Sequence, residues 1–376
     1  MTKNETKVVA WEPLQRFTRE LFIRAGMPPT EAEAEAGVLL WANLRGIDSH
    51  GVLRIPWYLE YIEKGMMNIS PDIKVINETP ATILLDADRA LGSVVTLKVI
   101  DMVVEKANQV GIGWALIRNL THQGALGYYS QILAEKGMAG IALVCNPPNM
   151  APFGARVAGV HNSPIAISVP AKRYRTLDLD MSTSVAAGGK LLLAIDKNSP
   201  IPEGWALDKD GKSTTNPKKI DEPGFRFGAL LPIAGPKGSG LAMMFECLSS
   251  VMAGNPLLEP ILFRREYGPQ TEQQQGQSAG KHPSDAPKHI QNSVIAAINI
   301  STFTDLDRYR EDIDKLIDSI KTLPKAEGFS EILVPGEPEK KAFKERSRNG
   351  IPLPVGTIRN LSIVSKKYGV KLPFSS

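Results

Sequence analysis

Cysteine is scarce in this sequence, and its scarcity limits the classes of protein to which the chain can belong. Cys145 and Cys247 are the only two cysteines among 376 residues, and each lies in an apolar run. A small scaffold held together by disulfides is therefore excluded. We expect two buried free thiols in a protein of a reducing compartment.

Long apolar segments are also missing. The first residues, MTKNETKVVAWEP, contain no apolar core of the kind found in signal peptides. No apolar run reaches the roughly 18 residues that are needed to cross a bilayer. The 44 basic and 40 acidic residues give a net charge of +4, which is too balanced to indicate a nucleic-acid surface. We therefore expect a cytoplasmic protein with no membrane or nucleic-acid partner.

The familiar local motifs for metal binding, phosphate binding and nucleophilic catalysis are missing as well. The five histidines show no His-x-x-x-His spacing, and the two cysteines form no Cys-x-x-Cys pair, so no metal site is expected. There is no Walker sequence and no Gly-x-Ser-x-Gly. Gly111-Ile112-Gly113 lacks the third glycine of the dinucleotide fingerprint and precedes a strand, so a Rossmann domain is not indicated.

Apolar spacing and turn residues predict a mixed α/β or α+β chain. Helices are expected at residues 14–26, 30–45, 48–65, 124–136 and 236–252, from Thr304 onward, and before Gly350. Strands are expected at residues 114–117, 140–144, 164–169, 176–180, 293–300 and 332–334. Thr30 and Glu33 are interpreted as a capping box. The Gln-, Gly- and Pro-rich segment 269–291 is predicted to be a mobile surface loop.

His50 and Arg54 form a candidate pair for chemistry. They are four residues apart at the expected start of a helix, which would place them on one helical face. An arginine can hold a substrate carboxylate in a bidentate contact. A histidine can donate a proton to the oxygen or nitrogen that becomes basic as hydride arrives at carbon. A helix N-cap with an incidental exposed histidine explains the same residues, and local sequence alone favours that explanation.

Three further segments could contact a cofactor. Residues 122–125 lie in a loop between a strand and a helix, and residues 237–240 open another helix, where free backbone amides suit a phosphate. Residues 178–184 end a strand in hydroxyl groups and could present a carboxylate to a histidine. A plain loop, an ordinary helix start and a capped strand end explain these segments at least as well from local sequence.

The order of the motifs is more specific than any one of them. The chain contains SHG at 49–51 with Arg54, then DMSTS at 180–184, IPEGWALD at 201–208, GPKGSGL at 235–241 and ILVPGE at 332–337. Over roughly residues 12–370, this ordered set resembles the malate/L-lactate dehydrogenase family. That family also includes ureidoglycolate dehydrogenase, sulfolactate dehydrogenase, 2,3-diketo-L-gulonate reductase and piperideine-2-carboxylate/pyrroline-2-carboxylate reductase.

The resemblance implies a fold that the periodicity does not show. It implies a non-Rossmann NAD(P)-binding domain with a mostly antiparallel sheet, formed by residues 81–292. Residues 1–80 with 293–376 would form a helical domain from both ends of the chain. The family is typically homodimeric, so the expected partners are a second copy and a small-molecule substrate.

The implied reaction is the interconversion of a small 2-oxo acid and its 2-hydroxy acid by hydride transfer, with NAD or NADP as the cofactor. A reductase of a cyclic or N-alkyl imine is the alternative, because it also delivers hydride to C2 and a proton to the heteroatom. A non-catalytic ligand-binding protein with the same fold is a third hypothesis. The intact His50, Arg54, Asp180 and Lys237 argue against it.

The resemblance also implies roles for individual residues. His50 would be the proton donor, with Ser49 and Asp180 as its polar partners, and Arg54 would bind the substrate carboxylate. In the ureidoglycolate dehydrogenase branch the acid/base role goes to the histidine that matches His122, so the two assignments compete. The implied cofactor contacts are His122, Gln123, Gly124, Ala125, Asn146, Asp180, Met181, Ser182, Thr183, Ser184, Lys237, Gly238, Gly336, Glu337 and Pro338.

The chain departs from the family pattern at one place. Family members usually read Gly-Thr-Asn-Pro where this chain has residues 161–164, His-Asn-Ser-Pro. Asn162 then matches a substrate-contacting threonine, so the substrate is expected to differ. The basic run of Lys172, Arg173 and Arg175 could meet the 2′-phosphate of NADP, although a solvated hairpin turn is the more common explanation of such a run.

Overall fold

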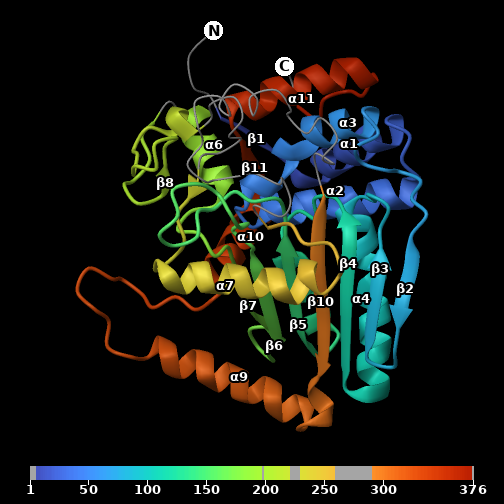
Figure 1. Ribbon diagram of the computed structural model, residues 1–376, viewed down its shortest axis with the longest axis vertical. Helices are drawn as coiled ribbons and strands as arrows, with labels where there is room; N and C mark the ends of the chain where they lie inside the picture. Colours follow the sequence, from blue (N-terminus) through green and yellow to red (C-terminus); the bar gives the residue numbers. More distant parts are fainter. Residues whose placement is uncertain (1–5, 197–198, 221–228, 259–289, 375–376) are drawn as a thin grey trace, which may run out of the picture. The chain divides into compact units, whose positions relative to one another are not determined.

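The computed structural model describes residues 6–196, 199–220, 229–258 and 290–374 (Figure 1). The chain packs as two compact units. Unit 1 comprises Met1–Leu143, Ile165–Met181 and Val294–Ser376, and unit 2 comprises Val144–Pro164 and Ser182–Ser293. The predicted domains assign the sheet strands differently from these units, and they stay a prediction. The predicted loop at 269–291 lies almost wholly outside the described residues.

A seven-stranded sheet forms the centre of unit 1, in the order β2-β3-β4-β10-β5-β6-β7. Its strands are β2 (Lys74–Glu78), β3 (Thr82–Asp86), β4 (Ile112–Leu120), β5 (Met138–Cys145), β6 (Ile165–Pro170), β7 (Thr176–Met181) and β10 (Gln291–Asn299). Antiparallel pairs join β2 to β3, β5 to β6 and β6 to β7, whereas β3 and β4 run parallel. The predicted mixed class with a mostly antiparallel sheet is confirmed.

Helix α4 (Gly92–Val110) makes the crossover that the parallel β3–β4 pair requires. It lies against β4 at Gly113, where an added Cβ would stand 2.1 Å from the carbonyl oxygen of Val103. Gly113 lies inside β4, and this close approach of α4 is the reason that a glycine is needed there. Helix α5 (Gly127–Glu135) connects β4 to β5.

The helices from the two ends of the chain share one apolar core in unit 1. They are α1 (Trp11–Arg24), α2 (Pro29–Leu44), α3 (Ile55–Glu63) and α11 (Val355–Tyr368), which lie together near one end of the sheet (Figure 1). The core contains Phe22, Ile55, Tyr58 and Leu361, and all four residues are buried. Strand β1 (Lys7–Val9) pairs antiparallel with β11 (Ile351–Leu353) and joins the two ends. The remaining helices are α9 (Leu306–Lys321) and α10 (Glu337–Asn349).

Unit 2 has its own smaller core, which includes Met150, Val160, Leu191, Ile201 and Leu230. Its elements are α6 (Gly188–Asp196), β8 (Ala206–Leu207), β9 (Ala229–Leu230) and α7 (Pro236–Glu246), which continues as a π-helical turn over Cys247–Val251. Across the described residues, none of the helices combines the length and the apolar character that a membrane span needs.

Four local predictions are wrong. Helix α2 begins at Pro29, because proline suits the first helical position, so Thr30 lies inside the helix and forms no capping box. Asp305, not Thr304, caps α9 and accepts from the Arg308 amide at 2.8 Å. Residues 332–334 form no strand. Cys247 is exposed, because the π-helical turn places it on the solvent side, whereas Cys145 is buried as expected.

Candidate functional site

The segment that carries His50 consists of two successive 3₁₀ turns, Asp48–His50 and Val52–Arg54, before α3 begins. Gly51 separates the turns in an extended conformation. Its Cα passes so close to Asn43 that an added Cβ would stand 2.1 Å from Asn43 Oδ1, which accepts the Val52 amide at 2.8 Å. The predicted single helix is therefore wrong here, and a glycine at this position is a steric requirement.

Two hydrogen bonds fix the geometry of the His50–Arg54 segment. Ser49 Oγ lies 3.0 Å from His50 Nδ1, and Arg54 Nε donates to the Ser49 carbonyl at 2.7 Å. The guanidinium carbon of Arg54 lies 5.3 Å from the centre of the Trp57 ring. Among the described residues, the two terminal nitrogens of Arg54 have no hydrogen-bond partner, so they can receive a carboxylate.

The electrostatics of this segment favour an anionic ligand. Burial, and then the nearby charge of Arg54, lower the pKa of His50 to about 3. Burial also lowers the pKa of Arg54. A neutral imidazole therefore lies beside a partly desolvated cation, and a bound carboxylate would supply the counter-charge that the cation lacks.

His122 stacks on His50, with ring centres 5.5 Å apart and an interplanar angle of 17°. The Tyr58 hydroxyl lies 2.5 Å from His122 Nδ1, and the Gly124 amide donates to the same nitrogen at 3.2 Å. Burial raises the pKa of Tyr58, so its hydroxyl stays protonated and can donate. Because Nδ1 receives two donors, neutral His122 carries its proton on Nε2.

Asp180 also belongs to unit 1, but its carboxylate bonds to the start of α5 and not to His50. Its carboxylate accepts the Gly127 amide at 2.8 Å, at the start of α5. Desolvation raises its pKa to about 6, although the residue as a whole is exposed. In the described part of the chain no hydrogen bond joins Asp180 to His50. The contact holds the end of β7 against the loop at 122–126.

Unit 1 contains the other predicted cofactor contacts near His122, near Asp180 and at the start of α10. Gln123 is buried and donates to Thr96 Oγ1 at 2.6 Å. Ala125 is buried, and Met181 ends β7. Gly336 caps α10 with a φ of +79°, and an added Cβ there would stand 3.0 Å from Asp178. The first residues of α10, Glu337 and Pro338, therefore lie next to β7.

Unit 2 gathers a second group of predicted residues. Asn162 is buried, and its side chain donates to Ser184 Oγ at 3.1 Å and accepts from Asn149 at 3.1 Å. Ser182 Oγ lies 3.1 Å from Ser184 Oγ. Gly238 packs on this group, because an added Cβ would stand 2.6 Å from the Thr183 carbonyl. Lys237, one residue earlier in α7, is exposed.

Two buried polar atoms of this group stand out. Asn146 Oδ1 and Thr183 Oγ1 have no hydrogen-bond partner within the ranges that the structure describes. Buried polar groups are almost always paired, so these atoms indicate a missing partner. An amide oxygen and a hydroxyl suit the carboxamide and ribose hydroxyls of a nicotinamide dinucleotide, and the residues present fit such a group. The described residues hold no cluster that could bind a metal ion.

Comparisons with known proteins agree with this fold. The family model described as Malate/L-lactate dehydrogenase matches residues 9–362. L-sulfolactate dehydrogenase of Methanocaldococcus jannaschii is 35% identical over 370 residues, covering 98% of this chain and 97% of that protein. Ureidoglycolate dehydrogenase (NAD(+)) of Escherichia coli K12 is 30% identical over 371 residues, covering 98% and 99%. The solved malate dehydrogenase of Entamoeba histolytica has a TM-score of 0.88 at 26% identity, covering 98% and 100%.

These findings define the chain as an oxidoreductase, a dehydrogenase of the class that acts on hydroxy acids. It belongs to the malate/L-lactate dehydrogenase family, so the resemblance predicted from the ordered motifs is confirmed. Dehydrogenases of this kind use a nicotinamide cofactor.

Sequence reasoning missed Tyr58 and Trp57. Trp57 contacts His122 edge to face, with ring centres 5.5 Å apart, and Tyr58 bonds to the same imidazole. Tyr58 lies four residues after Arg54, and that spacing on α3 was the available signal. Both residues lie in an apolar stretch of α3 whose sequence is typical of an ordinary buried helix face, so neither was predicted to belong to the site.

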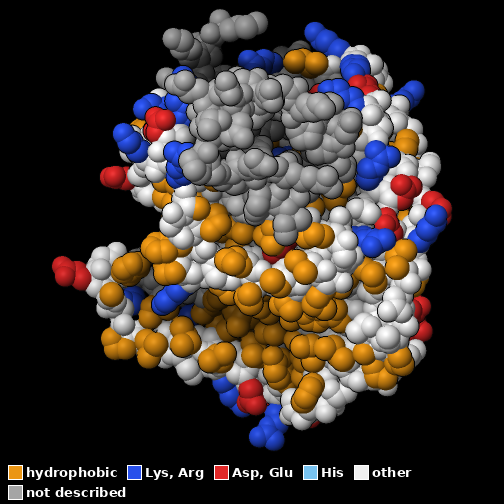
Figure 2. Space-filling model, viewed as in Figure 1, with side chains coloured by type: hydrophobic (Ala, Val, Ile, Leu, Met, Phe, Trp, Pro, Cys, Tyr) orange, Lys and Arg blue, Asp and Glu red, His pale blue; other side chains and the backbone are white. Residues whose placement is uncertain are grey.

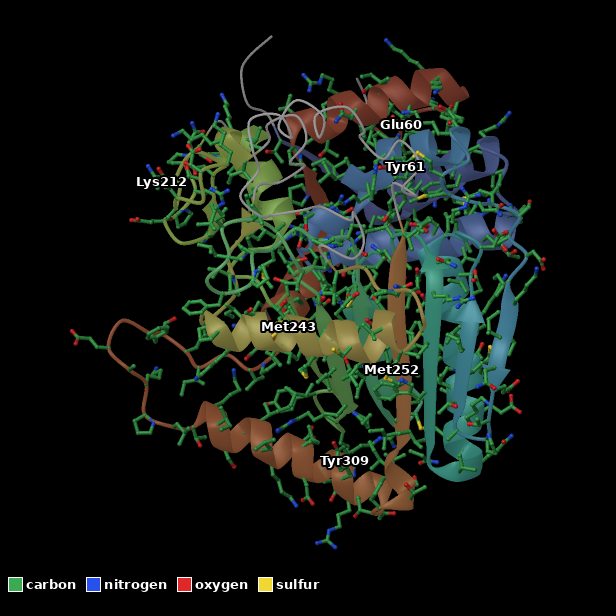
Figure 3. The ribbon with its side chains drawn as sticks, in the orientation of Figure 1. Glu60, Tyr61, Lys212, Met243, Met252 and Tyr309 are labelled. Carbon is green, nitrogen blue, oxygen red and sulfur yellow. The ribbon has the colours of Figure 1, made fainter. Side chains whose placement is uncertain are left out.

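The tautomer of His122 gives a testable prediction. We expect ¹⁵N NMR of the free protein to show an unprotonated Nδ1 and a protonated Nε2 for this residue. Tyr58→Phe should keep the ring packing, remove one donor and lower the free energy of unfolding in urea by about 1 kcal/mol. Tyr309→Phe is the matched control, because the Tyr309 hydroxyl (Figure 3) has no hydrogen bond among the described residues. A protonated Nδ1 in the parent protein would contradict the assignment.

Proposed function

We propose that this protein interconverts a small 2-oxo acid and its 2-hydroxy acid, with hydride exchanged with NAD(P) and the proton carried by His50. The observation that supports this most is the neutral imidazole of His50 beside Arg54, whose terminal nitrogens have no partner among the described residues. A bound nicotinamide dinucleotide would supply or accept the hydride.

Arg54 binds the substrate carboxylate in this proposal. Its Nε is already engaged with the Ser49 carbonyl, so the planar guanidinium is held in one orientation. Each terminal nitrogen can then donate a hydrogen bond to one carboxylate oxygen, which fixes the position of C2 of the acid relative to the reacting groups. Trp57 supports the guanidinium from the side.

His50 exchanges the proton of the C2 oxygen. At neutral pH its pKa of about 3 keeps the free imidazole unprotonated, so it is ready to accept the hydroxyl proton as the hydroxy acid is oxidised. Reduction of the oxo acid needs the protonated form. Binding of a carboxylate to Arg54 offsets the positive charge that helps to lower this pKa, so the substrate itself promotes protonation of His50.

The tautomer of His122 supports His50 as the acid/base group. An Nε2–H imidazole whose Nδ1 is occupied by two donors can give a hydrogen bond but has no free lone pair for a proton. We therefore propose that His122 orients the substrate oxygen by donating a hydrogen bond to it from Nε2. Ser49 is the polar partner of His50, and Asp180 acts on the neighbouring loop through Gly127.

Each unit by itself contains some of the residues that are expected to contact the cofactor. In unit 2 the unpaired atoms of Asn146 and Thr183, the hydroxyls of Ser182 and Ser184, and the start of α7 at Lys237 and Gly238 would hold the dinucleotide. In unit 1 the contacts would come from residues 122–125, 180–181 and 336–338. A substrate contact by Asn162 would require it to exchange hydrogen bonds that it already makes with Ser184 and Asn149.

The basic run at the β6–β7 turn supports NAD over NADP. Lys172 pairs with Glu311 at 2.6 Å, Arg173 pairs with Asp318, and Arg175 lies 3.7 Å from Glu135. A 2′-phosphate would have to compete with carboxylates that already neutralise these cations. The hairpin explanation of this run agrees with the pairing of Pro170 with Thr176.

We also propose a cytoplasmic homodimer. Helix α7 and the π-helical turn expose six large apolar side chains, and hydrophobic side chains gather over α7 (Figure 2). Met243 and Met252 are labelled on this segment in Figure 3. The six side chains are Leu241, Met243, Met244, Leu248, Val251 and Met252. An apolar surface of this kind is typical of an interface. The free thiols of Cys145 and Cys247 suit a reducing compartment.

The pH dependence of oxidation tests the role of His50. Because kcat/KM reports the free enzyme and its His50 pKa is about 3, we expect no loss of kcat/KM from this group between pH 8 and 5. A histidine of ordinary pKa would lose roughly tenfold by about pH 5.5. His50→Ala should lower turnover by about 10²–10⁴-fold with NADH binding preserved, as measured by NADH fluorescence. Equal turnover in the variant and the parent would remove His50 from the mechanism.

Arg54→Lys tests the carboxylate contact. The lysine keeps the charge but loses the planar fork, so we expect KM for the acid to rise about tenfold, the equivalent of about 1.4 kcal/mol, with a smaller change in kcat. Arg16→Lys on the exposed face of α1 is the matched control. Steady-state kinetics with the best acid from the assay below give both constants, and an unchanged KM would count against this role.

A crossed assay tests the function as a whole. NADH and NADPH are each combined with a set of 2-oxo acids and with cyclic imines such as piperideine-2-carboxylate, and oxidation of the cofactor is followed by absorbance. We expect turnover of oxo acids with NADH. Preferential turnover of a cyclic imine would favour the alternative reaction, and no turnover with any compound would reject the proposal.

A further inference from the structure

One arginine of α10, Arg346, makes hydrogen bonds that hold the segment that carries His50. Arg346 donates from Nη1 to the Asn43 carbonyl at 2.6 Å and makes a two-pronged contact with Asp48, at 2.7 Å to Oδ1 and 3.1 Å to Oδ2. Asn43 Nδ2 also donates to Asp48 Oδ1, at 2.7 Å. The Arg346 side chain is only 14% exposed. Asp48 is therefore fixed from two sides, and Ser49 and His50 follow it directly.

The same helix packs on the end of α2 through neighbouring side chains. Phe343 receives the Arg45 guanidinium 4.8 Å from its ring centre, and an added Cβ at Gly46 would lie 3.5 Å from Ala342. One face of α10 thus covers the chain from Asn43 to Asp48. Because that stretch ends in the first 3₁₀ turn, its position decides where the imidazole and the Ser49 carbonyl stand.

The other end of α10 is attached to β7. Lys340 pairs with Asp178 at 3.2 Å and also donates to the Thr176 carbonyl. Glu337 is held by Lys321 of α9 at 2.6 Å. The helix therefore connects β7, the strand that carries Asp180, to the turn that carries His50.

We propose that Arg346 is a positioning residue for the reaction: through Asp48 it sets the orientation of His50 and, through the Ser49 carbonyl, that of Arg54. This inference rests on the proposed function for its kinetic consequence. The two-pronged geometry requires a guanidinium, because a lysine would make a single contact. A displacement of about 1 Å of a catalytic group costs on the order of 10²-fold in rate.

The test compares Arg346→Ala, Arg346→Lys and Asp48→Asn with Arg348→Ala, which changes an exposed arginine on the same helix that makes no hydrogen bond or ion pair within the described chain. We expect kcat to fall about 10–100-fold in Arg346→Ala and less in Arg346→Lys, KM for the acid to rise, and Arg348→Ala to match the parent. The ¹⁵N and ¹H signals of the His50 imidazole, assigned with His50→Gln, should shift in the first three variants only. Combining Asp48→Asn with Arg346→Ala should cost no more than either change alone.

The outcomes separate the two proposals. Arg346→Ala with kcat within twofold of Arg348→Ala and unshifted His50 signals would overturn the positioning role. A parent protein that turns over no oxo acid or imine would reject the proposed function, while the imidazole signals would still decide whether Arg346 orients His50. If Arg346→Ala does not fold, Asp48→Asn, which preserves size, gives the same decision through the same signals.

Discussion

The bond between the Arg54 side chain and the Ser49 carbonyl is the contact on which the rest of the candidate site depends. It holds a partly desolvated cation beside an imidazole whose pKa burial lowers to about 3, so that the ring is neutral near pH 7. A charge without a partner is costly to bury, so in the proposed function a carboxylate ligand would gain affinity by pairing with it. In the proposed function, a substrate carboxylate would pair with Arg54 and, by offsetting its charge, would favour protonation of His50.

That contact exists only because segments distant in sequence hold the chain around it. Asn43 at the end of α2 and Arg346 in α10 both bond to Asp48, and Gly51 lets the backbone pass against the Asn43 amide. On the opposite side Tyr58 and the Gly124 amide fix the stacked ring of His122. The preorganisation of the site thus comes from neutral and charged hydrogen bonds made by α2, α3 and α10, and the sheet supplies the frame that holds these helices.

Sequence reasoning predicted the long, strongly periodic elements, such as α1, β4, β5 and α9, because their apolar spacing is a local property. It also singled out His50 and Arg54, although their common helix is in fact two 3₁₀ turns. It could not predict that the Asp180 carboxylate bonds to Gly127, because that contact joins residues far apart in the chain. Tyr58 escaped notice because its partner, the ring of His122, is equally distant.

The pairing of β1 with β11 has a consequence for biosynthesis. Phe22 on α1 and Leu361 on α11 belong to one core, and the strand pair that joins these segments needs residues that are more than 340 positions apart in the chain. At about 5–20 residues per second, tens of seconds separate the synthesis of α1 from that of α11. During that time the nascent chain exposes the part of the shared core that α11 covers.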